Sequence, residues 1–62
     1  MSLQPQLSSA STALRELTAR ITDLAERAAG TRNEDVATAL YEVERSLRMA
    51  TRRLDRLVAD RR

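Results

Sequence analysis

Apolar residues recur along most of the chain in alternating steps of three and four positions. In the first half they fall at Leu7, Ala10, Leu14, Leu17, Ile21, Leu24 and Ala28, and in the second half at Val36, Leu40, Val43, Leu47, Ala50, Leu54 and Leu57. A repeat of about 3.5 residues is typical of α-helices that pack as a left-handed coiled coil. It does not fit a β-strand, in which side chains alternate with a period of two. The pattern therefore predicts an all-α protein.

The repeat is interrupted once, at Gly30. Glycine just past a periodic segment commonly ends a helix, because it adopts the left-handed conformation without a Cβ penalty. Residues 31–34 then fit a capping box, with Asn33 as an alternative N-cap. Near the start of the chain, Pro5 suits the first turn of a helix. We therefore expect helices at about residues 5–29 and 34–60, joined by a turn at 30–33 within one domain spanning residues 1–62.

The two apolar stripes match each other if the chain folds back at this turn. Pairing residues whose numbers add up to 64 puts an apolar residue opposite an apolar residue in every layer, for example Leu24 opposite Leu40. A short connection is typical of antiparallel neighbours. One long helix in a parallel coiled coil is the alternative, since a glycine inside a helix costs only about 1 kcal/mol. Gly30 and the capping residues favour an antiparallel two-helix coiled-coil hairpin.

The short chain adds an argument for self-association. It has 62 residues, with no Cys and no His. Below roughly 70–80 residues a single core rarely stabilises a fold without a disulfide, a metal or a partner, and the missing residue types argue against the first two. One flank of the predicted seam is rich in small, uncharged residues. We expect it to dock a second hairpin in a homodimeric four-helix bundle, through Ala25, Ala37, Tyr41, Thr51 and Val58.

The same composition argues against catalysis. Without His or Cys the chain has no Ser-His or Cys-His nucleophile pair, and its carboxylates fall on the outer positions of the repeat. We therefore expect a protein that is not an enzyme and that binds no metal or cofactor. The favoured function is protein–protein interaction or regulation, through self-association or through another protein partner.

The net charge of +2 hides a strong asymmetry. Residues 1–44 carry four arginines and seven acidic residues, whereas residues 45–62 carry seven arginines and two acidic residues. Such a split complements the dipole of the second helix, and charge runs on helices are usually solvated faces. The alternative is an anion-binding regulator that contacts nucleic acid or a nucleotide, because arginine suits phosphate. The candidate residues are Arg45, Arg48, Arg52 and Arg56.

Three further features concern the location and the source of the protein. No stretch approaches the roughly 18–20 apolar residues of a membrane span, and the first residues lack the basic and apolar regions of a secretory signal. All basic residues are arginine, a bias that suggests a bacterial genome rich in G and C. We therefore expect a cytoplasmic bacterial protein.

Overall fold

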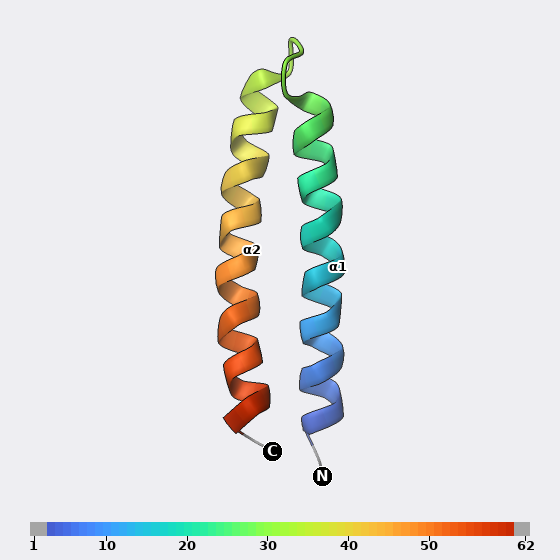
Figure 1. The fold of residues 1–62 in the computed structure, drawn as a ribbon, viewed down its shortest axis with the longest axis vertical. Helices are drawn as coiled ribbons and strands as arrows, with labels where there is room; N and C mark the ends of the chain where they lie inside the picture. The colour runs from blue at the N-terminus through green and yellow to red at the C-terminus, as the bar shows by residue number, and fades with distance from the viewer. Residues whose placement is uncertain (1–2, 61–62) are drawn as a thin grey trace.

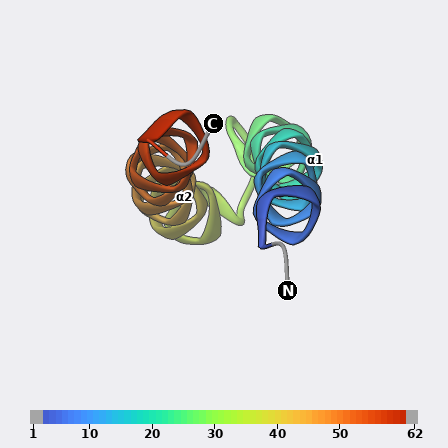
Figure 2. The ribbon, with the colours of Figure 1, turned by 90° about the horizontal axis from the view of Figure 1, so that it is seen from below.

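The chain forms a helical hairpin in the computed structural model, which describes residues 3–60 (Figure 1). Helix α1 spans Gln4–Ala28 and helix α2 spans Glu34–Asp60, and the described residues contain no strand. The two helices run antiparallel, side by side, so that the start of α1 and the end of α2 lie at the same end of a rod measuring 49 × 14 × 12 Å (Figures 1 and 2). The predicted all-α hairpin is confirmed, and its helices begin and end close to the expected residues.

The turn between the helices is built by the residues singled out in the sequence. Gly30 adopts a left-handed conformation with φ 76°, and its N–H donates a hydrogen bond to the carboxylate of Glu34. The hydroxyl of Thr31 donates to the carbonyl oxygen of Ala28 at 2.6 Å and accepts from the N–H of Asn33 at 3.0 Å. These bonds satisfy backbone groups that the ends of both helices would otherwise leave without partners.

The surface through which the helices pack differs from the predicted seam. The buried residues are Ser11, Thr18 and Ala25 on α1 and Ala37 and Val58 on α2. Several residues of the predicted layers are instead exposed to solvent. The exposed fractions are 49% for Leu24, 46% for Val36, 43% for Val43 and 46% for Leu57, and Ala10 and Ala50 are exposed as well. The prediction that these six residues form the interior of the hairpin is wrong.

Size and hydrogen bonding explain why the helices meet through the smaller side chains. Small residues let two helix backbones approach closely, and the polar ones bond directly across the seam. Ser11 donates to Asp55 and Thr22 donates to Glu44. The larger apolar side chains lie to one side of this contact, so that Leu14 and Leu47 are half-buried and Leu24 and Val43 are exposed.

The hairpin consequently has little enclosed core. No large side chain in residues 3–60 is fully buried. Leu7, Leu14, Leu40, Leu47 and Leu54 lie along the seam but remain half-buried. Neither α1 nor α2 combines the length and the apolar composition needed to cross a membrane.

Candidate functional site

A two-helix hairpin leaves two long faces open, and in this chain they differ in chemistry. On α1, Leu17 and Leu24 each directly precede a buried residue, and on α2 Val36 and Leu57 do the same. Because the helices are antiparallel, side chains one position before the seam on each helix project to the same side. We call this side the apolar face, and it comprises Ala10, Leu17, Leu24, Val36, Val43, Ala50 and Leu57.

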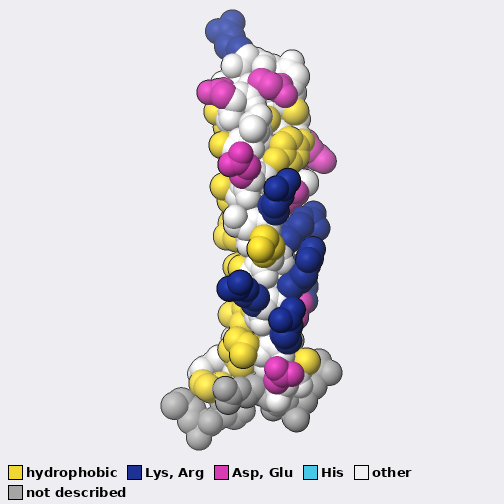
Figure 3. Space-filling model, turned by 90° about the vertical axis from the view of Figure 1, so that its left-hand side faces the viewer, with side chains coloured by type: hydrophobic (Ala, Val, Ile, Leu, Met, Phe, Trp, Pro, Cys, Tyr) yellow, Lys and Arg dark blue, Asp and Glu magenta, His cyan; other side chains and the backbone are white. Residues whose placement is uncertain are grey.

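The opposite side carries hydroxyls and charged groups. We call it the polar face, and it comprises Ser11, Arg15, Thr18, Thr22, Glu44, Arg48, Thr51 and Asp55. Figure 3 looks onto the outside of α2 and shows hydrophobic side chains along one edge and arginines gathered along the other. Contiguous apolar surface on a small protein commonly marks an interaction site, so the apolar face is a candidate for binding another protein surface. The arginines make the polar face a candidate for binding an anion.

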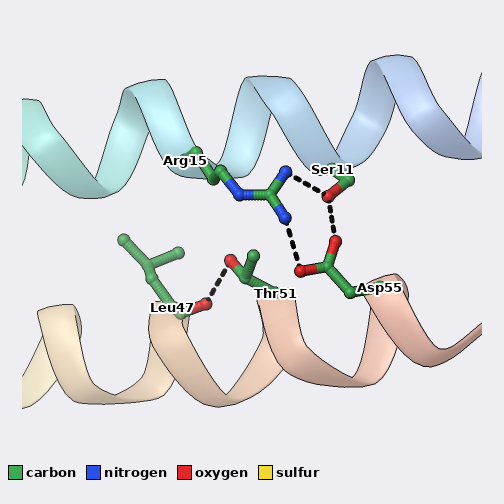
Figure 4. A network of polar contacts seen from close by, with 5 residues as sticks. All are labelled: Ser11, Arg15, Leu47, Thr51 and Asp55. Atoms are coloured by element: carbon green, nitrogen blue, oxygen red, sulfur yellow. Dashed lines mark hydrogen bonds and ion pairs between the residues drawn. The ribbon is translucent and has the colours of Figure 1, made fainter.

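The structure places most of the residues predicted for self-association inside the hairpin. Ala25 and Ala37 are 0% exposed and Val58 is 9% exposed. Thr51 is half-buried, and its hydroxyl donates to the carbonyl oxygen of Leu47 at 2.7 Å (Figure 4). Only Tyr41 keeps a large exposed fraction, 43%. Four of the five residues therefore have little surface left for contact with a second hairpin.

The sequence held a signal for this arrangement. The three-and-four spacing also passes through Ser11, Thr18 and Ala25, seven residues apart, and these are the buried positions of α1. A seam chosen by hydrophobicity passes instead through the larger apolar residues next to them, such as Leu17 and Leu24. The sequence analysis therefore missed that most residues of the apolar face are exposed, which leaves the hairpin with an uncovered apolar surface.

On the polar face, three side chains form a network between the helices (Figure 4). Arg15 donates through Nη1 to Oγ of Ser11 at 2.8 Å and through Nη2 to Oδ2 of Asp55 at 2.5 Å. The Ser11 hydroxyl in turn donates to Oδ1 of Asp55. The hydrogen bond from Ser11, and then the bond and charge of Arg15, lower the pKa of Asp55, while partial desolvation opposes them. The network therefore holds Asp55 in its charged form and orients the guanidinium of Arg15.

A second contact lies further toward the turn. Thr22 on α1 donates to the carboxylate of Glu44 on α2, and Arg48 lies 3.5 Å from the same carboxylate. The hydrogen bond from Thr22 lowers the pKa of Glu44, desolvation opposes it, and the charge and hydrogen bond of Arg48 add to the lowering. The polar face thus pairs two of its arginines with two carboxylates.

The four arginines of the alternative prediction are all exposed on α2 but do not form one site. Arg48 and Arg52 line a groove between the helices together with Arg15 of α1, which the sequence did not single out. Arg45 and Arg56 do not line this groove. Sequence spacing showed which arginines share a helix face. It could not show that an arginine of the other helix joins two of them.

Comparisons with protein families, curated proteins and solved structures found no match for this chain. Within the described residues, no group of three or more potential metal ligands comes together. The apolar face and the polar face are therefore the features from which a function can be inferred.

Proposed function

We propose that the protein is a non-enzymatic interaction module that self-associates, with the apolar face of one hairpin packed on that of a second copy in a four-helix bundle. One observation carries the proposal: large apolar side chains are exposed together on one open face. Leu24, Val36, Val43 and Leu57 each keep between 43% and 49% of their surface in water. The small-residue flank predicted from the sequence plays no part in this version of the dimer.

The energetics support covering this face. Burying a whole Leu or Val side chain stabilises a protein by roughly 1.5–3 kcal/mol, so covering the exposed half of one such side chain is worth roughly 1 kcal/mol. A dimer covers each of these side chains in both copies. The half-buried leucines of the seam, such as Leu14 and Leu47, would be covered by the same contact.

A second copy suits this face better than an unrelated partner. The face runs along both helices of a long, straight rod, so two copies related by a twofold axis present surfaces of matching length and composition. Four helices around one core also give each helix two neighbours, so that both the half-buried leucines of the seam and the residues of the apolar face are covered.

Molecular mass in solution tests the proposal. Sedimentation equilibrium of the wild-type chain at micromolar concentration is expected to give twice the chain mass of 7.0 kDa. Val43→Glu places a charge on the apolar face and is expected to weaken the dimer at least about tenfold, because an unpaired charge is costly to bury. The matched control is Met49→Glu, since Met49 is an equally exposed apolar residue of α2 outside the apolar face. It is expected to leave the dimer intact.

Two results would contradict the proposal. One is a wild-type chain that stays monomeric and helical throughout the micromolar range. The other is a dimer that Met49→Glu weakens as much as Val43→Glu does. The first result does not depend on whether any variant folds, and circular dichroism of each variant shows whether a loss of mass is accompanied by a loss of helix.

A further inference from the structure

The polar face contains a groove between the helices, with a volume of about 370 Å³. That volume lies at the lower end of the range for small-molecule sites, roughly 300–1,000 Å³. Arginines from both helices line it, Arg15 from α1 and Arg48 and Arg52 from α2. The other lining residues are Thr18, Ala19, Thr22 and Thr51, so the lining contains no carboxylate.

The hydrogen-bond donors that this groove offers come from the arginines. The hydroxyls of Thr18 and Thr51 already donate to carbonyl oxygens of their own helices, at 2.6 and 2.7 Å. These threonines and Ala19 therefore supply the uncharged part of the lining. The guanidinium groups have N–H groups to spare, because Arg48 makes one contact and Arg52 takes part in no ion pair within residues 3–60.

Charge and orientation favour an anion in this position. Asp55 and Glu44 lie beside the groove and offset two of the three positive charges, and their contacts hold the heads of Arg15 and Arg48 in place. Arg52 contributes the uncompensated charge. A guanidinium donates pairs of hydrogen bonds in a plane that matches the oxygens of phosphate. We propose that this groove binds the phosphate group of a small phosphorylated molecule, with Arg52 as the main ligand and Arg15 and Arg48 on either side.

A small molecule fits these observations better than a nucleic acid does. The groove is short, whereas a polymer is held by a continuous track of cations. Asp55 and Glu44 interrupt the positive surface along the seam. The chain contains a single aromatic residue, Tyr41, and so has no platform on which successive bases could stack.

The phosphate site and the proposed dimer occupy opposite faces. Five of the seven groove residues belong to the polar face, and the other two, Ala19 and Arg52, directly follow polar-face residues along their helices. None belongs to the apolar face, where the second copy would cover Leu24, Val43 and the other residues of that face. The two proposals can therefore fail independently. A monomeric wild-type chain that binds phosphate would contradict only the dimer, and a dimer without phosphate binding would contradict only the site.

Amide chemical shifts measured by NMR at low salt test the site, with inorganic phosphate and a nucleoside 5′-monophosphate as probes. Saturable shifts are expected at the groove residues Thr18, Thr22 and Thr51. Arg52→Gln is expected to weaken binding about tenfold or more, because it removes a charged donor pair. The matched control is Arg56→Gln, which removes the same charge one turn further along α2, outside the groove. It is expected to change the affinity less than about twofold.

Three outcomes would overturn the proposal. Equal losses in Arg52→Gln and Arg56→Gln would show attraction to the net charge of α2 without a site. Shifts that fail to saturate at high millimolar concentrations of both probes would show no binding. Binding of a short DNA duplex, without binding of either small probe, would assign the arginines to a nucleic acid. Sedimentation of Arg52→Gln at the wild-type mass would show that a lost affinity does not come from a lost assembly.

Discussion

Ser11 shows how a single residue sets the contact between the helices. It occupies a buried seam position, with 3% of its surface exposed, where a coiled coil usually places a large apolar side chain. The cost of burying a hydroxyl is offset because the group is hydrogen-bonded to Asp55 and to Arg15. A side chain that bonds to one particular partner also favours one register over its neighbours. In this hairpin the polar seam residues therefore help to select the register of the two helices, and they also let the helix backbones approach closely.

The lowered pKa of Asp55 predicts a dependence of stability on pH. A carboxylate whose folded pKa lies below its unfolded value of 3.8 stabilises the fold above that value, and this stabilisation is lost as the pH falls through the folded pKa. Ser11→Ala removes the largest cause of the lowering. The thermal midpoint of Ser11→Ala, followed by circular dichroism from about pH 6 to about pH 3, is expected to fall less than that of the wild type. Ser9→Ala, an exposed serine on the same helix, is the control. An equal fall in all three proteins would show that Ser11 does not govern this titration.

Between the elements, the turn depends on the conformation of one glycine. Gly30 has φ 76°, and a Cβ placed on it would meet no atom within 4 Å. The cost of a larger residue there is therefore a backbone cost, not a clash. Glu34, the first residue of α2, accepts a hydrogen bond from the N–H of Gly30. The end of α1 and the start of α2 therefore both depend on the conformation of Gly30.

Substitution of Gly30 is expected to destabilise the hairpin by a predictable amount. Gly30→Ala should lower the free energy of unfolding by about 1 kcal/mol, since an L-residue in the left-handed region costs roughly 1–2 kcal/mol. Gly30→Asn should cost less, because asparagine tolerates this conformation. Urea denaturation at one fixed protein concentration measures both. A Gly30→Ala chain as stable as the wild type would show that the turn adopts another conformation in solution.

The two helices and their turn could be predicted from sequence because their causes are local. The apolar period, Pro5 and Gly30 each act within a few residues of their own position. The packing surface could not be predicted in the same way. It depends on how closely Ser11, Thr18 and Ala25 let the helices approach, and on a hydrogen bond between Thr22 and Glu44, residues that are far apart along the chain. The phosphate groove combines Arg15 with Arg48 and Arg52, and no spacing within one helix reveals such a combination.

At the scale of the whole molecule, the hairpin is a rod with one apolar and one polar face and no large side chain fully buried in its described part. Such a rod has too little buried surface for a chain of this size to be strongly stable alone. Covering the apolar face would provide the missing contribution. Folding and self-association are then expected to be coupled.

This coupling predicts that stability depends on protein concentration. An assembly that forms only from folded chains raises the thermal midpoint as concentration increases, by mass action. The midpoint of the wild type, measured by circular dichroism, should rise over a hundredfold increase in concentration, whereas that of Val43→Glu should not. A midpoint independent of concentration in the wild type would mean that the single hairpin is stable by itself.

The start of α1 and the end of α2 lie at the same end of the rod, which has a consequence for a hairpin that is joined to another domain. A label or domain attached before α1 or after α2 would join the rod at the same end, which we call its base. The turn with Gly30 lies at the opposite end of the rod, which is 49 Å long. The first turn of α1 and the last turn of α2 are joined there, since the side-chain amide of Gln4 donates to the carbonyl oxygen of Val58 at 3.2 Å. The molecule therefore has two attachment points at one end and the turn between its helices at the other. Two attachments at its base would be held side by side, and a group carried on the turn would be held away from both.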